Sequence, residues 1–428
     1  MREVFLLFAL SVSLFAQSPK EIRAMARDGP SAIPKLQELL RSPETSTRVE
    51  AVKTITEISG AASIDPLILA TQDSDPEIQI RAAGGLVNVY LPGYARTSAG
   101  SSLRRAGNNL KAKFIDTNDR TIDRYVIVRP DVIQALGKLA RGGASMDSRA
   151  NAARAIGVLR GAAALPDLIE ALRTKDGNVL YECLIAMQKI GDESAGPKIR
   201  YLLHDLDQRV QLAAIETAGI LRDRGALGDL KNLVKEARDG ARDNKVKRAA
   251  LTAAAMMPDL ANRDLYSTYL RDRDERLRAS AAEGFARLRN PADAPMLQQA
   301  YDDEAKNSPR LSLAFALVMD GKTETSEYSP LRYLVNSLNS IAYRGEAIPF
   351  LIEAARERVV RDSLYDSLET GTKDEKIQLA KILAISGDRN TIPHLEKVSR
   401  DKDEQIAAEG LRALRNLQAR LGKTTTSS

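Results

Sequence analysis

The stretch Ala164-Leu-Pro-Asp-Leu-Ile-Glu-Ala-Leu172 returns along the chain with substitutions. It recurs as Ala195-Gly-Pro-Lys-Ile-Arg-Tyr-Leu-Leu203 and, in shorter form, as Ala294-Pro-Met-Leu-Gln-Gln-Ala300. The intervals between equivalent positions are 31, 31, 35 and 32 residues. These positions are Pro166, Pro197, Gly228, Arg263 and Pro295. Repeats of this length are typical of solenoids, in which each unit packs only against its neighbours. The sequence therefore predicts an architecture and says little about function.

The composition agrees with such an architecture. The chain has 428 residues, of which 4% are aromatic and none is Trp. A solenoid needs no large aromatic centre, because each unit buries a thin layer against the next. The single cysteine, Cys183, excludes an internal disulfide, and with only two histidines it leaves little for a Cys/His zinc site.

The N-terminus has the features of a secretory signal. Arg2 precedes an apolar run from Val4 to Phe15, and Ala16 suits the position before cleavage. The run is too short to span a bilayer, and no later stretch is apolar enough to do so. We therefore expect residues 1–16 to be removed and the protein to be periplasmic or secreted. The alternative is a buried N-terminal helix.

Each repeat contains two amphipathic segments. The first carries apolar residues at helical spacing, as in Leu165, Leu168 and Leu172. The second is rich in alanine, as in the segment 148–159, where Gly157 also occurs. Small residues allow close packing of the second helices, so the predicted fold is an all-α solenoid of antiparallel helix pairs.

Between the two segments an acidic residue precedes a basic or amide residue by four positions. The pairs are Glu44 and Arg48, Asp75 and Gln79, Asp207 and Gln211, Asp243 and Lys247, and Asp274 and Arg278. We expect each acid to cap the second helix, where its carboxylate can accept unpaired N–H groups. Their recurrence in many units argues against a catalytic or metal-binding role.

The second segment, Ser148-Arg-Ala-Asn-Ala-Ala-Arg-Ala-Ile-Gly-Val-Leu159, resembles the second helix of the HEAT-repeat family, in particular the bacterial HEAT units of phycobilisome-lyase-type proteins. The resemblance covers most of residues 30–90, 130–322 and 346–420. It implies an armadillo-like superhelix and a bacterial source. It also implies that the second helices line a concave surface that binds protein or nucleic acid.

Two segments break the repeat and suggest a division of the chain. The predicted parts are a signal peptide (1–16), N-terminal repeats (17–90), a basic insertion (91–129), central repeats (130–322), an irregular junction (323–345), C-terminal repeats (346–422) and a disordered tail (423–428). Within the junction the sequence predicts a helix over 330–341. Within the insertion it predicts a short strand over 125–128.

The basic insertion is the candidate partner-binding segment. It contains eight basic and three acidic residues, a net charge of +5 within a chain of net charge +6. Insertions in solenoids often lie on the binding face. The candidate residues are Arg104, Arg105, Lys111, Lys113, Arg120 and Arg124. The alternative is a structural cover over an exposed helix edge.

Other candidate motifs do not predict chemistry. The segment 316–323 has some likeness to a phosphate-binding loop but lacks its first glycine and follows a helix. His204 and His394 lie about six repeats apart, so each is predicted to be a surface residue. Cys183 occupies an alanine position and is predicted to be buried. The basic stretch 238–248 is interleaved with acids, which favours a solvated face over a nucleic-acid site.

We therefore expect a non-enzymatic protein-interaction scaffold without catalytic residues, cofactor or metal. The expected partner is another protein with an acidic surface. One alternative is a lyase-like HEAT protein that holds a small ligand. The other is a nucleic-acid-binding protein that is not exported.

Overall fold

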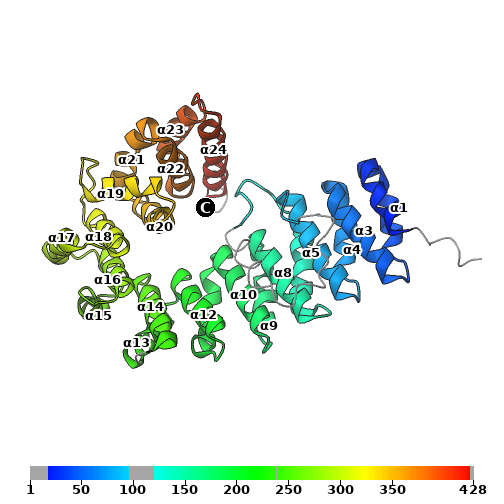
Figure 1. The fold of residues 1–428 in the computed structure, drawn as a ribbon, viewed down its shortest axis with the longest axis horizontal. Coiled ribbons are helices and arrows are strands. Elements are labelled where there is room, and N and C mark those ends of the chain that lie inside the picture. Colours follow the sequence, from blue (N-terminus) through cyan, green and yellow to red (C-terminus); the bar gives the residue numbers. More distant parts are fainter. Residues whose placement is uncertain (1–17, 96–119, 238–239, 425–428) are drawn as a thin grey trace, which may run out of the picture. The chain divides into compact units, whose positions relative to one another are not determined.

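The computed structural model describes residues 18–95, 120–237 and 240–424 (Figure 1). Within these ranges the regular structure is helical, and no strand occurs. None of the helices in the described ranges is both long and apolar enough to cross a membrane. The chain divides into two compact units. The first contains residues 1–122 and 126–199, and the second contains residues 123–125 and 200–428.

The first unit is a stack of helix pairs in two layers. The first helices of the pairs are α2 (Ile33–Leu39), α4 (Ile64–Ala70), α7 (Pro130–Gly142) and α9 (Leu165–Ala171). The second helices are α3 (Thr45–Ile58), α5 (Pro76–Tyr90), α8 (Met146–Val158) and α10 (Gly177–Ile190). The short helix α1 (Pro19–Ala24) packs against α3, and α11 (Gly196–Ile199) ends the unit.

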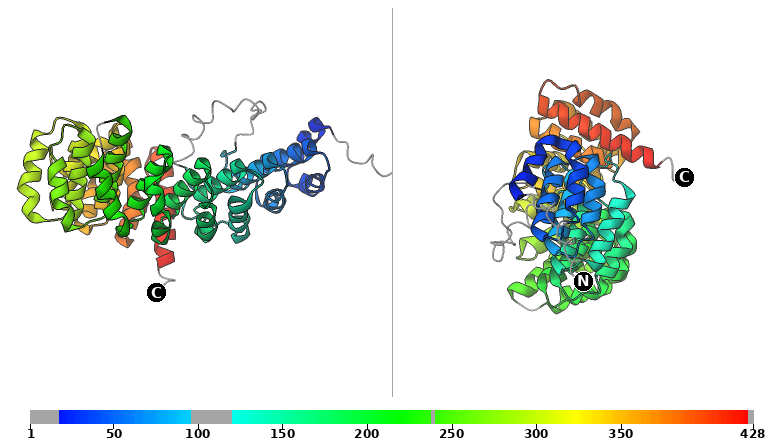
Figure 2. Two further views of the ribbon diagram at one scale, coloured as in Figure 1. Left: turned by 90° about the horizontal axis from the view of Figure 1, so that it is seen from below. Right: turned by 90° about the vertical axis from the view of Figure 1, so that its right-hand side faces the viewer.

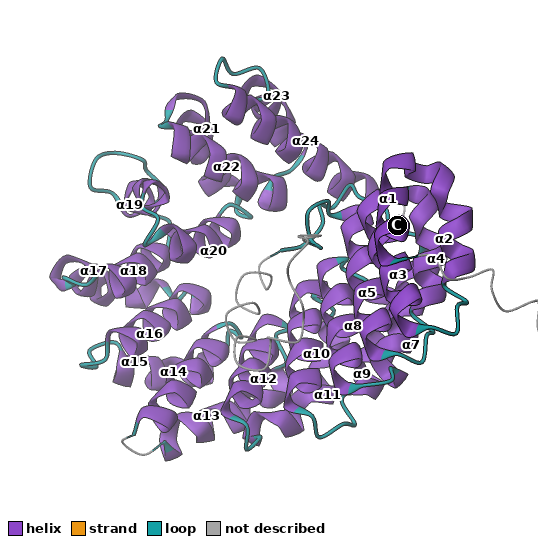
Figure 3. Ribbon diagram, turned by 45° about the vertical axis from the view of Figure 1, so that its right-hand side comes forward, coloured by secondary structure: helices purple, strands orange, loops and turns teal. Residues whose placement is uncertain are grey.

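The second unit repeats this arrangement (Figure 3). Its first helices are α13 (Leu227–Glu236), α15 (Arg263–Tyr269), α17 (Ala294–Asp303), α19 (Pro330–Asn336), α21 (Arg358–Thr370) and α23 (Ile392–Val398). Its second helices are α12 (Gln208–Ile220), α14 (Ala241–Ala255), α16 (Glu275–Leu288), α18 (Asn307–Met319), α20 (Arg344–Ala354), α22 (Lys373–Ser386) and α24 (Glu404–Thr424). Each second helix packs against the next one, and Figure 2 shows α24, in red, as the last of them. The predicted all-α solenoid is confirmed.

Short 3₁₀ turns lead into many first helices. They are η1 (Met25–Ala32), η2 (Ala61–Ser63), η4 (Ala162–Ala164), η5 (Glu193–Ala195), η7 (Arg224–Ala226), η8 (Leu260–Asn262), η9 (Pro291–Asp293) and η11 (Arg389–Thr391). Two more, η6 (Arg200–His204) and η10 (Ser337–Asn339), follow α11 and α19. The turns η4, η5, η7, η8 and η9, which precede first helices, begin at intervals of 31, 31, 36 and 31 residues. The position equivalent to Pro166 is therefore Asp264, and the predicted Arg263 was one residue early.

The second helices approach one another as closely as their small residues allow. A Cβ atom on Gly157 of α8 would lie 2.9 Å from the Cα of Ala186 on α10. A Cβ on Gly219 of α12 would lie 2.8 Å from the Cα of Ala253 on α14. Cys183 on α10 is fully buried in this layer, as predicted.

The predicted caps are confirmed at three of five positions. The carboxylates of Asp75, Asp207 and Asp274 accept backbone N–H groups in the first turns of α5, α12 and α16. Glu44 makes no such bond and accepts the Thr47 hydroxyl instead, because its side chain is one carbon longer. Asp243 lies inside the first turn of α14, whose N-cap is Gly240, so that prediction was wrong.

The residue four positions after each cap has a different partner from the cap itself. Arg278 donates to the carbonyl of Asp272 at 2.8 Å and pairs with Glu304 of the next repeat at 2.7 Å. Gln211 donates to the carbonyl of Leu203 at 3.0 Å. These side chains therefore satisfy the end of the preceding helix, and Arg278 also joins two repeats.

Both predicted elements in the irregular segments need revision. The helix predicted over 330–341 is α19 followed by η10, and helical structure ends at Asn339. The strand predicted over 125–128 is wrong, since Tyr125 lies in a turn and Val126 to Val128 are irregular. Ile127 is 87% exposed. A single extended segment gains little without a partner strand, and the described surroundings offer only helices.

Candidate binding site

The basic insertion is described only at its ends. Arg104, Arg105, Lys111 and Lys113 lie outside the described residues, whereas Arg120 and Arg124 are both exposed. The backbone carbonyl of Arg120 accepts from the Lys189 ammonium at 3.5 Å. The backbone N–H of Arg124 donates to Oδ1 of Asn416 at 2.7 Å. Neither of these contacts uses a guanidinium group.

The segment 123–125 belongs to the second unit and is held by α24. Nε of Arg412 donates to both carboxylate oxygens of Asp123, at 3.0 and 2.9 Å. Burial opposes the charge of Asp123, but the hydrogen bond from Arg412 outweighs it and lowers the pKa of this carboxyl. The ionised pair therefore anchors the segment 123–125 to α24.

A second basic site in the second unit was not predicted from the sequence. It is a cavity of about 210 Å³ at the C-terminal ends of α12, α14, α16 and α20. We call it the arginine pocket. Its lining residues are Arg222, Met256, Pro258, Arg287, Arg289, Glu353, Arg356 and Glu357. Residues up to 135 positions apart in the chain meet here, because each repeat contributes the end of one helix.

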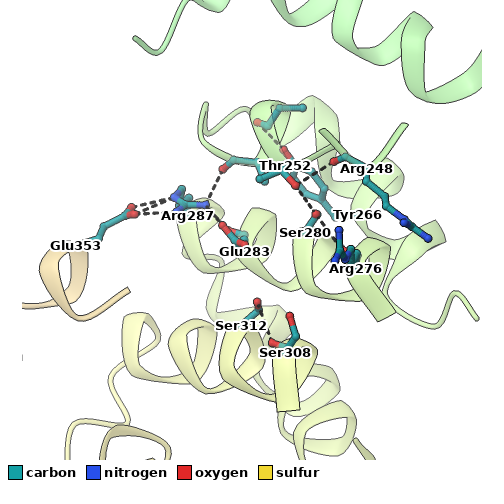
Figure 4. Close-up of polar contacts among 12 residues, drawn as sticks. Arg248, Thr252, Tyr266, Arg276, Ser280, Glu283, Arg287, Ser308, Ser312 and Glu353 are labelled. Carbon is teal, nitrogen blue, oxygen red and sulfur yellow. Dashed lines mark hydrogen bonds and ion pairs between the residues drawn. The ribbon is translucent and has the colours of Figure 1, made fainter. Parts of the chain in front are cut away.

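Arg287 is the most buried of the four arginines. Its Nε and Nη2 donate to the two carboxylate oxygens of Glu353, at 3.0 and 2.8 Å (Figure 4). Its Nη1 donates to Glu283 at 3.1 Å and to the carbonyl of Ala255 at 3.3 Å. The Arg287 side chain is only 10% exposed, and those of Glu283 and Glu353 are 14% and 22% exposed.

The surroundings of Arg287 favour a charged guanidinium. Burial disfavours its charge, but Glu283 and Glu353 outweigh burial and raise its pKa. Burial also raises the pKa of Glu283, an effect that the charge of Arg287 opposes. The guanidinium lies 5.4 Å from the ring centroid of Phe315, which stacks on Phe350 at 4.8 Å. Arg287 is thus held by its own helix α16 and by α14, α18 and α20.

The other three arginines of the pocket are exposed. Arg289 pairs with Glu357 at 2.8 Å. The side chains of Arg222 and Arg356 have no hydrogen bond or ion pair with any residue in the described ranges. Four arginines and two glutamates give the lining a net charge of +2. Both glutamates are paired, so two guanidinium groups face the cavity without a carboxylate.

Arg222 and Arg289 also adopt an unusual backbone conformation. Their φ angles are 52° and 51°, in the left-handed region. The corresponding helix ends in other repeats use Gly191 and Gly321, which adopt this region without a steric cost. For a residue with a Cβ the cost is about 1–2 kcal/mol. A cation at a helix C-terminus recovers only about 0.3–1 kcal/mol. Helix ending alone therefore does not account for the two arginines.

Arg160 has the same conformation, with a φ of 49°, but has a local explanation. It lies in the first unit, where its Nη2 donates to the Thr121 hydroxyl at 3.1 Å. Arg222 has no comparable contact among the described residues.

The rare residues are placed as structural or surface groups. Burial raises the pKa of the Cys183 thiol to about 12, which disfavours a thiolate nucleophile. His204 is exposed. His394 stacks on Tyr365 and its Nδ1 lies 2.7 Å from Oε1 of Glu369. No group of three or more possible metal ligands occurs within the described ranges.

The basic stretch 238–248 is described from Gly240 onward, and its charges are used locally. Arg248 pairs with Asp274, and Arg242 donates to the carbonyl of Leu206 at 3.0 Å. Lys247 lies 5.1 Å from the ring centroid of Tyr269. This stretch is therefore a mixed-charge face, as predicted.

Stacked helix pairs with one layer of small residues define an α-solenoid. Residues 133–219 match the family model for HEAT repeats, so this part of the chain consists of HEAT repeats, as the resemblance predicted. A comparison with curated proteins finds no match.

Several solved structures are similar to this chain at low sequence identity. An engineered protein is 19% identical, with 90% of this chain and 98% of that chain covered and a TM-score of 0.38. A chain from the complex of CpcE and CpcF of phycocyanin lyase from Nostoc sp. PCC7120 is 18% identical, with coverages of 77% and 97% and a TM-score of 0.31. A chain from a complex of Kap95p with RanGDP is 12% identical, with coverages of 95% and 60% and a TM-score of 0.41.

Proposed function

We propose that this protein is an exported, non-enzymatic HEAT-repeat scaffold that binds an acidic surface of another protein. One observation carries the proposal. Among the described residues, partly buried ion pairs such as Arg48 with Asp73 and Arg278 with Glu304 join one repeat to the next, whereas the arginine pocket and the insertion retain a surplus of positive charge.

The ion pairs between repeats recur at intervals of about one repeat. Examples are Arg48 with Asp73, Arg154 with Glu182, Arg248 with Asp274, Arg278 with Glu304, and Lys376 with Asp401. These pairs stabilise the stack and leave little charge for a ligand. The remaining cations include exposed ones such as Arg222 and Arg356, and exposed cations attract acidic partners over the Debye length of about 8–10 Å.

The experiment is capture of a partner by the mature protein, residues 17–428, from periplasmic extract at low and high salt. Replacing Arg104, Arg105, Lys111 and Lys113 with Glu should abolish capture while the melting temperature barely changes. The matched control reverses four exposed cations elsewhere, Arg271, Arg273, Lys306 and Lys322. Capture that survives reversal in the insertion and is indifferent to salt would assign the insertion a covering role.

A further inference from the structure

We propose that the arginine pocket binds the carboxylate side chain of an acidic segment on the partner protein. The carboxylate would contact Arg222, Arg289 and Arg356. Arg287 would stabilise the side of the pocket that the carboxylate packs against. This inference rests on the proposed scaffold function, and it names the chemistry that the scaffold recognises.

The balance of charge in the arginine pocket favours an acidic ligand. Arg287 occupies both oxygens of Glu353, and Arg289 occupies Oε1 of Glu357. The pocket's own carboxylates therefore leave Arg222 and Arg356 without a carboxylate partner. Guanidinium groups bind carboxylates through paired N–H groups, so two arginines at one cavity form a site for an acidic group.

Other cations surround Arg356. The pKa of Arg420 is lowered, first by burial and then by the positive charges of three nearby arginines. These arginines are Arg124, Arg356 and Arg361. Asp388 offsets part of this repulsion and pairs with Arg361. The guanidinium of Arg420 also donates to the carbonyl of Gly387. An incoming carboxylate near Arg356 would relieve repulsion among these cations.

The backbone conformation of two pocket arginines also indicates a functional position. Arg222 and Arg289 have positive φ angles at helix ends, where Gly191 and Gly321 occur in two other repeats. Both strained residues line the same cavity. Strain of this kind often marks a functional position.

Size distinguishes a side chain from a free ligand. Pockets for small molecules and cofactors usually measure about 300–1,000 Å³ and enclose most of the ligand. The arginine pocket, at about 210 Å³, is smaller and has three exposed arginines at its rim. An aspartate or glutamate side chain that enters from a partner's surface fits these dimensions.

The test uses a fluorescent peptide with a Glu-Glu pair in a Gly-Ser background, and its Gln-Gln counterpart. Wild-type protein should bind the Glu-Glu peptide and not the Gln-Gln peptide. Its affinity for the Glu-Glu peptide should fall as the salt concentration rises. Hydrogen bonds between charged groups are stronger than neutral ones, so Arg222→Gly and Arg356→Ala should each weaken binding roughly tenfold or more. Arg271→Ala removes an exposed arginine outside the pocket and should change nothing.

The choice of Arg222→Gly separates binding from folding. Glycine relieves the strain at a φ of 52°, so stability should stay the same or rise while affinity falls. Arg222→Lys keeps the charge and should retain part of the affinity. Equal binding of the acidic peptide by wild type and the Arg222→Gly, Arg356→Ala double variant would overturn the proposal. Pocket-dependent binding of inorganic phosphate without peptide binding would also overturn it.

The two proposals fail in different ways. If the double variant still captures the partner and binds the acidic peptide as wild type does, the pocket proposal fails and the scaffold proposal stands. If wild type captures no partner from periplasmic extract, the scaffold proposal fails whatever the peptide does.

Discussion

Arg287 on α16 binds Glu353 on α20 through two N–H groups, although 66 positions separate them in the chain. The pair reaches past α18, which contributes Phe315 beneath the guanidinium. It therefore joins two second helices that are not adjacent in the stack. A contact of this range resists relative movement of three consecutive repeats.

Replacing Arg287 with Met should destabilise the second unit. Glu283 and Glu353 would lose their cation, and breaking a buried ionic network typically costs about 3–5 kcal/mol. Because Glu353 is 22% exposed, we expect the lower end of this range. The matched control is Arg289→Met, whose exposed pair with Glu357 should contribute about 0–1 kcal/mol. Urea unfolding followed by circular dichroism measures both, and equal losses in the two variants would contradict the prediction.

Close packing of the second helices predicts opposite effects for two glycines of the first unit. Gly157→Ala places a Cβ 2.9 Å from the Cα of Ala186, so backbone must move and stability should fall by about 1–3 kcal/mol. Gly84→Ala, inside α5, meets nothing within 4 Å. It should raise stability by about 0.5–1 kcal/mol, since alanine favours a helix over glycine. Thermal unfolding of the two variants tests the sign of each change.

Asp320, at the end of α18, predicts a pH effect. Burial and the charge of Asp293 raise its pKa from 3.8 to about 6, although Arg289 opposes them. Between about pH 4 and pH 6 the folded state binds more protons at this site than the unfolded state, so its contribution to stability falls as pH rises. At pH 7, Asp320→Asn should therefore stabilise the protein by roughly 1–3 kcal/mol.

The pH effect is best measured as a difference between proteins. Carboxyls such as Asp123 and Glu304 have lowered pKa values, so their contribution to the stability of the protein is lost as pH falls. This opposite trend would mask the effect of Asp320 if only the wild-type protein were measured. The stability gain of Asp320→Asn should shrink from pH 7 to pH 4. The control Glu327→Gln, at an exposed position, should show no such trend. A pH-independent gain would rule out the titration of Asp320 as the cause.

Export predicts a defined N-terminus. Cleavage after Ala16 leaves Gln17 as the first residue of the mature chain. Mass spectrometry of protein from its native host should find this form in the periplasm or the medium. An intact chain that starts at Met1 and stays in the cytosol would contradict export and with it the proposed site of action.

Much of the fold could be predicted because its signals are local. Each of these signals can be recognised within fewer than 40 consecutive residues. They are the interval between repeats, the apolar spacing of the first helices and the alanine content of the second helices. The caps at Asp75, Asp207 and Asp274 depend on the next turn of the same helix. The predictions were wrong where the structure of a segment depends on residues outside it. Asp243 lies within α14 because that helix begins earlier, and the segment 125–128 is irregular because no strand lies beside it.

The arginine pocket was decided by tertiary structure alone. Its arginines lie between positions 222 and 356, so no stretch as short as one repeat contains them all. One signal existed, because Arg222 and Arg289 occupy repeat positions where Gly191 and Gly321 also occur. The sequence determined a stack of helix pairs because helix formation and nearest-neighbour packing depend on residues close in the chain. Only the stacking of four helix ends decided which charges share one cavity, since electrostatic interactions depend on distance in space and not on separation along the chain.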